Sequence, residues 1–290
     1  MYAEVARTRP THVILPKLTT FVWHPKLLNK ALFLMYPTVT QLVVHIDDPP
    51  QAYKNFPEAS AFFIDAASWL PNLTILHILA SYSVRSVQAS LLHLLASVLR
   101  LKKVTLPRYW LSSSVVSTLA GLPRLEVVHV GQGQGACDDV EAFNVILPDG
   151  AFPNLINLTL EVNLSDAEEL IRSSSFPRHI AVFNILSLRL DSPSVVQCFL
   201  ASCSTHCRSL TSLNLELINT LEDIPESSRI TMETIGPLLA FPNLPQFTLT
   251  YNQPLAITGS DAHRLASRWK ILEESRVQGL EARQSNSMNN

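Results

Sequence analysis

Cysteine and histidine, two residues that bind zinc, crowd into one short stretch of this 290-residue chain. The stretch holds Cys198, Cys203, His206 and Cys207. A structural zinc site needs closely paired ligands and usually a second pair elsewhere, and the one remaining cysteine, Cys137, is far away in sequence. We therefore expect buried thiols on a helix, and we assign no metal ligand and no cofactor.

Other patterns that carry catalysis are incomplete or missing. The segment G-Q-G-Q-G at 131–135 lacks both the spacing of a dinucleotide-binding loop and the Lys-Ser/Thr of a phosphate-binding loop, so it predicts a connecting loop. The sequence contains no G-x-S-x-G or H-E-x-x-H motif, and no pair of acids that can be assigned to one site. We expect that the protein is not an enzyme, and we assign no catalytic residue.

Charge and hydropathy exclude several further classes. The 22 basic and 24 acidic residues are not clustered by sign, which argues against nucleic-acid or membrane-surface binding. The longest apolar stretch, near 87–101, is too short and too interrupted to cross a membrane. The first residues lack the apolar run of a secretory signal, and four cysteines without such a signal indicate reduced thiols. We expect a cytoplasmic or nuclear protein.

The organising feature of the chain is an internal repeat. A six-residue frame, apolar-x-x-apolar-x-apolar, recurs nine times and advances by about 28 residues a copy. The frames are Leu18/Phe21/Trp23, Val39/Leu42/Val44, Leu73/Leu76/Ile78, Leu101/Val104/Leu106, Leu125/Val128/Val130, Leu155/Leu158/Leu160, Phe183/Leu186/Leu188, Leu210/Leu213/Leu215 and Leu244/Phe247/Leu249. This frame is typical of the strand of a leucine-rich repeat.

Proline marks the entry to most of these frames. Six frames follow a proline that ends the preceding helix and favours extended backbone beside it: Pro16, Pro37, Pro71, Pro123, Pro153 and Pro242. Helical spacing lies between the frames, at 25–36, 58–70, 84–100, 112–122, 167–173, 193–207 and 232–241. The predicted fold is therefore α/β: a leucine-rich-repeat horseshoe solenoid with a curved parallel sheet on its concave face and helices on its convex face.

The same frame predicts domain limits and turns. We expect an N-terminal extension over 1–14, a repeat domain of about nine copies plus a degenerate tenth over 15–275, and a polar tail over 276–290. The ninth position of a copy often holds a side chain that bonds the turning backbone, as at Asp47, Ser81, Asn163, Asp191 and Asn252. The other four copies hold Lys26, Tyr109, Gly133 and Ile218, so we expect irregular turns there.

Three segments stand out beside the repeat frame: the opening L-P-K-L-T-T-F-V-W at 15–23 with Y-P-T-V-T-Q-L at 36–42, the cysteine-ended helix at 199–210, and the segment from Ser260 to Trp269. These segments resemble the repeat region of mushroom-type fungal F-box proteins. The resemblance covers roughly residues 10–275 and rests on spacing and punctuation. The family's usual proline after the terminal tryptophan is replaced here by Lys270.

This resemblance implies a substrate receptor of a cullin–RING ubiquitin ligase, whose F-box binds the ligase adaptor and whose repeats hold the target. Too few residues precede Leu18 for an F-box, so we expect a truncated chain that binds the adaptor only if an F-box is encoded upstream. The alternative left open is a ligase-independent scaffold or recognition protein with the same horseshoe. In both cases we expect a monomer that binds a protein target.

Positions in each copy are counted from the first apolar residue of its frame and continue past the sixth. The predicted binding site is the concave face, formed by the third, fifth and seventh positions, because alternate strand residues point to opposite faces. Its candidate contact residues are Val22, His24, Val43, His45, Ile75, His77, Lys103, His129, Asn157, Thr159, Glu161, Arg189, Asn214 and Glu216. We expect the strongest contribution from Val43, Ile75 and His77. His24 and His45 should lie side by side, where a metal or pH-sensitive contact competes with an ordinary polar contact surface.

Overall fold

The computed structural model describes residues 15–24, 35–46, 57–80, 84–131, 143–187, 191–217, 229–241, 244–251, 255–268 and 274–279. These residues fall into two compact units. The first unit is Met1–Leu155 and the second is Ile156–Asn290.

The first unit alternates strands with helices. Its strands pair in parallel, each with the next along the chain: β1 (Thr20–Trp23), β2 (Gln41–Ile46), β3 (Ile75–Ala80), β4 (Lys103–Leu106) and β5 (Val127–Val130). Its described helices are α2 (Pro57–Trp69), the 3-10 turn η3 (Val84–Ser86), α3 (Gln88–Ser97) and α4 (Ser113–Ala120). The helices predicted at 58–70, 84–100 and 112–122 are confirmed, and that at 25–36 lies almost wholly outside the described residues.

The second unit repeats this plan. Its parallel strands are β6 (Asn157–Glu161), β7 (Val182–Ser187), β8 (Ser212–Leu217), β9 (Gln246–Tyr251) and β10 (Glu274–Gly279). Its helical elements are α5 (Leu164–Arg172), α6 (Pro193–His206), α7 (Met232–Ile235), the 3-10 helix η5 (Gly236–Ala240) and α8 (Gly259–Arg268). The degenerate tenth frame forms β10, which runs across residue 276, where we expected the polar tail to begin.

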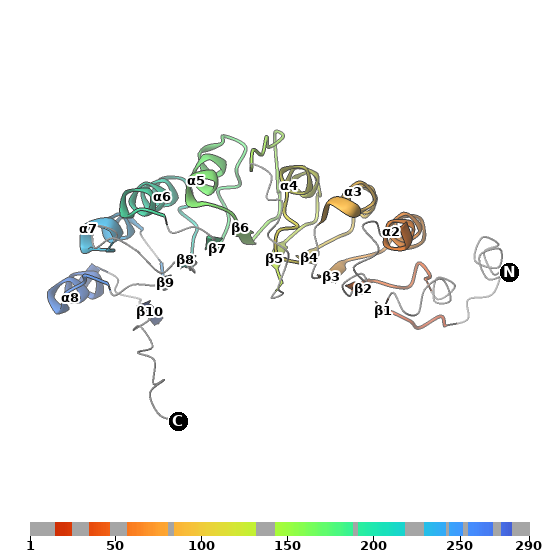
Figure 1. Ribbon diagram of the computed structural model, residues 1–290, viewed down its shortest axis with the longest axis horizontal. Coiled ribbons are helices and arrows are strands. Elements are labelled where there is room, and N and C mark those ends of the chain that lie inside the picture. The colour runs from red at the N-terminus through yellow and green to blue at the C-terminus, as the bar shows by residue number, and fades with distance from the viewer. Residues whose placement is uncertain are drawn as a thin grey trace, which may run out of the picture. The chain divides into compact units, whose positions relative to one another are not determined.

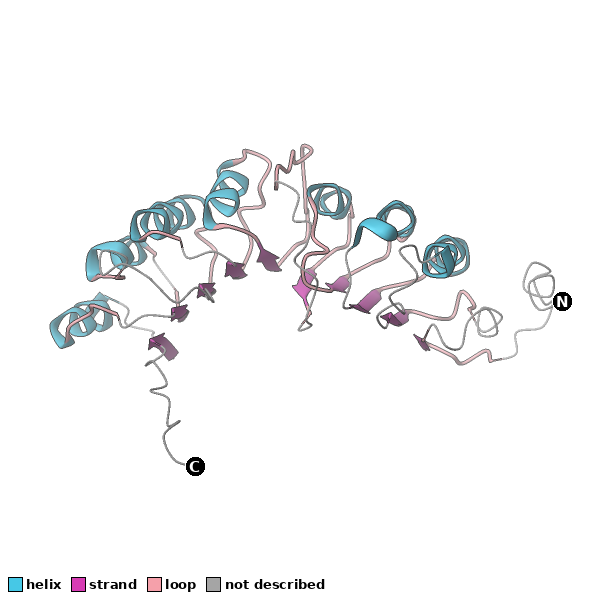
Figure 2. Cartoon of the chain, viewed as in Figure 1, coloured by secondary structure: helices cyan, strands magenta, loops and turns pink. Residues whose placement is uncertain are grey.

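Within each unit, the described helices lie on one face of the sheet and leave the other face without helices (Figures 1 and 2). The alternation of side chains explains this arrangement. Along β2, Leu42, Val44 and Ile46 are buried, and the residues between them are partly exposed. The buried residues pack against the helices, as the ring of Trp23 on β1 does with Phe62 on α2, at 4.1 Å between centroids.

One frame lies three residues earlier than predicted. We expected Phe183, Leu186 and Leu188 to form the core positions of β7. The ladder instead pairs Phe183 with Leu158 and Leu213, both of which stand at the fourth frame position. Ile180, Phe183 and Ile185 are fully buried, so they form the frame of this copy. Leu186 lies half-buried on the opposite face, and Leu188 is outside the described residues.

Hydrogen bonds between consecutive copies set the register ahead of each strand. The backbone N–H of Thr74 donates to the carbonyl of Thr40 at 2.8 Å, and that of Lys102 donates to Thr74 at 2.8 Å. The second unit repeats this bond from Ala181 to Ile156 and from Thr211 to Ala181. Ala181 thus occupies the second position of its copy, which agrees with the earlier frame.

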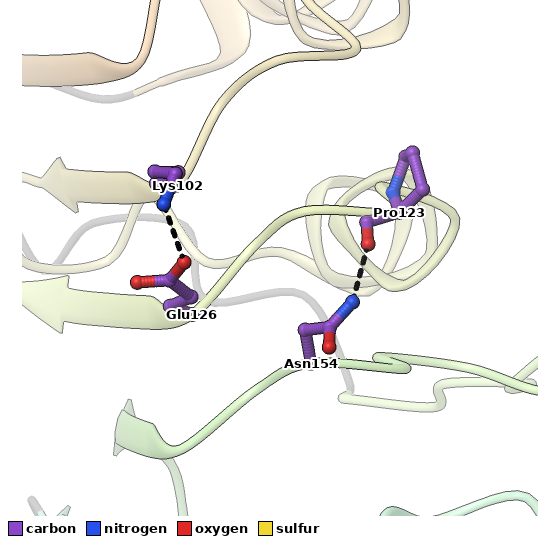
Figure 3. A network of polar contacts seen from close by, with 4 residues as sticks. All are labelled: Lys102, Pro123, Glu126 and Asn154. Atoms are coloured by element: carbon purple, nitrogen blue, oxygen red, sulfur yellow. Dashed lines mark hydrogen bonds and ion pairs between the residues drawn. The ribbon is translucent and has the colours of Figure 1, made fainter.

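The Pro-Asn-Leu turns add a side-chain bond between copies. Nδ2 of Asn72 donates to the carbonyl of Pro37 at 2.8 Å, and Nδ2 of Asn154 donates to the carbonyl of Pro123 at 2.7 Å. Figure 3 shows the second of these bonds beside the 2.8 Å ion pair of Lys102 with Glu126. The proline that begins each turn therefore also offers an acceptor to the next copy.

Replacing Asn154 with alanine should lower the free energy of unfolding by about 1 kcal/mol, because one hydrogen bond between copies is lost. Asn154→Asp is the matched variant, since it keeps the size of the side chain and removes the donor. It should destabilise at least as much, because its carboxylate would face the Pro123 carbonyl. Urea unfolding followed by circular dichroism measures both. Wild-type stability of Asn154→Asp would contradict the assigned role of Nδ2.

We expected irregular turns after the strands of copies that lack a bonding side chain at the ninth position, and one of these turns is described. Tyr109 has a φ of 63°, a left-handed conformation that is uncommon for a residue with a side chain. An irregular turn is therefore confirmed in that copy. Lys26, Gly133 and Ile218 lie outside the described residues.

Candidate functional site

The candidate site is the face of each sheet opposite the helices, here called the helix-free face. In the first unit, the fifth frame positions form one row across the strands, because each residue is paired with the next in register. The row runs Val22, Val43, His77, Thr105 and His129. Val22 is 51% exposed and the other four are half-buried, so these side chains are accessible to a partner.

The predicted contact between His24 and His45 is confirmed. Their rings stack with 4.6 Å between centroids and 7° between planes. The two residues stand at the seventh frame position of neighbouring copies, and neighbouring strands lie about 4.8 Å apart, so the imidazoles meet face to face. Leu79 follows in the same row, paired with His45.

Lys103 is the first residue of β4 and holds the third frame position of its copy, on the strand between those of His77 and His129. It is exposed, and its register partners are Ile75 on β3 and Val127 on β5. Burial, together with the nearby His45 and Lys103 charges, lowers the pKa of His77. Burial, with Lys103 as the second cause, lowers the pKa of His129. Both imidazoles are therefore more easily kept neutral than an exposed histidine.

The helix-free face of the second unit has a different chemistry. Its fifth positions form a polar row of Thr159, Asn184, Asn214 and Thr248, in which Nδ2 of Asn184 donates to Oγ1 of Thr159 at 3.1 Å. The seventh positions place Leu186 between two glutamates, Glu161 and Glu216. This face can exchange hydrogen bonds with a partner, whereas that of the first unit combines apolar side chains with imidazoles and the Lys103 ammonium.

Two predicted contact residues of the second unit are not open to solvent. Thr159 is 5% exposed and Glu161 is 8% exposed, although both stand at face positions. Nearby, Oδ1 of Asn157 is buried and has no hydrogen-bond partner among the described residues. Strand β6 therefore offers less contact surface than its frame positions suggested, since side-chain exposure depends on tertiary neighbours as well as on strand alternation.

Most of the other predicted contact residues lie on the helix-free face, as the frame predicted. Val22, Val43, Ile75, His77, Lys103, His129, Asn214 and Glu216 lie at face positions of their strands and are exposed or half-buried. Arg189 lies outside the described residues. The sequence reasoning missed Asn184, because the β7 frame was placed three residues late; the pattern Ile180-x-x-Phe183-x-Ile185 could have located it.

The three cysteines of α6 and the residue after it divide between the core and the surface. Cys203 and Cys207 are buried, as expected, whereas Cys198 is exposed. Burial and the neighbouring Cys207 thiol raise the pKa of Cys203 well above its usual value, which keeps it protonated and unreactive. No cluster of three or more histidine, cysteine or acidic side chains in the described part of the chain is placed to hold a metal ion.

Comparison with known proteins adds no family. Neither a scan against protein-family models nor a search of curated proteins finds a match for this chain. Among the helices that the structure describes, none has the length and apolar character needed to cross a membrane.

Proposed function

We propose that this chain is a leucine-rich-repeat solenoid that binds a protein target on its helix-free face, without catalysing a reaction. The observation that carries the proposal is the row from Val22 through Val43 to His77, which is held in register by the strands and accessible to solvent. A row of apolar and polar side chains on a rigid sheet suits a folded partner, because little conformational entropy is lost when it binds.

The periodicity of the chain supports the leucine-rich-repeat assignment. The strands β1 to β8 each follow a turn, the strands of each unit pair in parallel at the same frame positions, and the described helices lie on one face of the sheet. A repeat array presents an extended surface of this kind, on which successive copies contribute equivalent side chains.

We further propose that the bound target is a substrate of a cullin–RING ubiquitin ligase, and that this chain is the target-recognition part of an F-box-type receptor. The support for this step is the sequence resemblance at 15–42, 199–210 and 260–269. Two measurements test it: co-purification of the ligase adaptor, and reading of the transcript upstream of Met1 for an F-box. Without adaptor or F-box, the chain would act as a ligase-independent recognition protein.

The test of the binding face replaces its three central residues with glutamate. We expect the triple variant Val43→Glu, Ile75→Glu, His77→Glu to lose capture of the partner that the wild-type chain retains in a quantitative pull-down. Hot-spot losses of this kind reach about 2–4 kcal/mol, or more than about 30-fold in affinity. Unchanged capture by this variant would overturn the proposed site.

The matched control variant introduces three glutamates on the helices, on the opposite side of the sheet. Ala61, Ile64 and Ala96 are exposed on α2 and α3, so Ala61→Glu, Ile64→Glu, Ala96→Glu adds equal charge away from the helix-free face. This control should capture the partner as the wild type does. Thermal unfolding of both variants by circular dichroism separates loss of binding from loss of fold.

A further inference from the structure

The helix-free face of the first unit carries a lysine and several histidines, side chains that are or can become positively charged. His45, His77, Lys103 and His129 stand on four consecutive strands, β2 to β5. His45, His77 and Lys103 lie on one diagonal, because each is offset by two residues in the same direction from the next in register, and His129 is offset by two residues in the opposite direction from Lys103. We call these four residues the cationic row.

No acidic side chain is interleaved with them at the described face positions. The alternate residues of β1 to β5 and the residues that continue them are Thr20, Val22, His24, Gln41, Val43, His45, Ile75, His77, Leu79, Lys103, Thr105, Pro107, Val127, His129 and Gly131. The face positions of the second unit include Glu161 and Glu216 instead. Just before the strands, Lys102 is paired with Glu126 at 2.8 Å. The cationic row is therefore chemically distinct within the described chain.

We propose that the cationic row binds an acidic, extended peptide segment of the protein target, and that this binding strengthens as the pH falls from neutral to mildly acidic values. This inference deepens the proposed function and rests on it.

Spacing favours an extended segment. Strands about 4.8 Å apart and an offset of two residues, about 6.6 Å, place successive members of the row about 8 Å apart. Alternate side chains of an extended peptide lie on one side at about 6.6–7 Å. Every second residue of an acidic segment can thus approach His45, His77 and Lys103 in turn, while the residues between them point away from the sheet.

The electrostatics of the row supply the pH dependence. Burial and the charges of His45 and Lys103 lower the pKa of His77, and burial with Lys103 lowers the pKa of His129, so both imidazoles lose protons readily in the unbound protein. A carboxylate beside them favours the protonated form and raises the pKa again. Binding therefore takes up protons, and by linkage the affinity increases as the pH falls.

The experiment uses the full chain and a fluorescein-labelled probe peptide, Glu-Ser-Glu-Val-Glu-Ser-Glu, in anisotropy titrations near pH 6 and pH 7.5, on either side of the usual histidine value. We expect binding that is at least about fivefold tighter near pH 6, since a pKa change of one unit corresponds to about tenfold in affinity. The same peptide with glutamine in place of every glutamate should bind weakly at both pH values.

Two variants test the residues. His77→Gln, His129→Gln should reduce the pH effect to less than about twofold. His93→Gln replaces an exposed histidine on α3, on the helix side of the sheet, and should behave as the wild type does. The imidazole signal of His77 in NMR spectra should titrate at higher pH when the glutamate peptide is present.

Several outcomes would overturn the inference. Absence of binding to the glutamate peptide, binding without pH dependence, or equal pH-dependent binding of double-stranded DNA would each do so. These outcomes are separable from failure of the proposed function. If the glutamate triple variant loses capture of the partner while the probe does not bind, the face binds protein by another chemistry; if capture is unchanged, the face itself is not the site.

Discussion

Replacing Phe183 with alanine should lower the free energy of unfolding by about 3–5 kcal/mol, whereas replacing Leu186 with alanine should lower it by about 1 kcal/mol or less. Phe183 is fully buried, and its ring lies 6.2 Å from the rings of both Phe176 and Phe199, measured between centroids. Removing it leaves a cavity between β7 and α6 that the surrounding rings cannot fill. Leu186 is half-buried on the helix-free face, where water can replace the lost contacts.

This pair of variants also decides between the two frames that the sequence allows for β7. If Leu186 were a core position, its replacement would cost about 2–5 kcal/mol. Chemical denaturation of both variants, followed by far-ultraviolet circular dichroism, gives the comparison. A larger loss for Leu186→Ala than for Phe183→Ala would show that the strand is shifted by three residues from its position in the structure.

Replacing Trp23 with alanine should cost about 3–5 kcal/mol, because the indole is 1% exposed and stacks on Phe62 at 4.1 Å with an interplanar angle of 24°. This contact joins β1 to α2 across one copy of the repeat. Without the indole, β1 loses an aromatic partner that anchors it to the rest of the first unit.

A double-mutant cycle with Phe62→Ala isolates the ring contact itself. We expect a coupling energy of about 0.5–1.5 kcal/mol between the two rings, measured by urea unfolding of the wild type, both single variants and the double variant. Val22→Ala is the control, since Val22 is adjacent but 51% exposed and its loss should change stability by about 0.5 kcal/mol or less. Additive single losses would mean that the rings do not stabilise one another.

The helix-free faces of the two units differ in chemistry. In the first unit, Val22, Val43 and His77 share a row with Thr105 and His129. In the second unit, Asn184 and Asn214 share a row with Thr159 and Thr248.

The sequence by itself determined the repeat and most of the strand faces. Burial with a period of two is a local property of a strand, so frames such as Leu42/Val44 and Leu213/Leu215 identified core residues that are fully buried in the structure. The same period placed His24 and His45 in neighbouring copies, and the stacked rings follow from the strand spacing. Proline and helical spacing likewise located α2, α4 and α6 to within a few residues.

Only the tertiary structure decided what depends on contacts between distant residues. Phe183 fits two frames equally well by hydrophobicity, and the backbone bonds from Ala181 to Ile156 and from Thr211 to Ala181 select the earlier one. Thr159 and Glu161 have the strand position of accessible residues but are buried, because exposure is set by everything that packs around a side chain. Periodicity therefore assigns a residue to one face of a strand, whereas register and accessibility are established when the copies pack together.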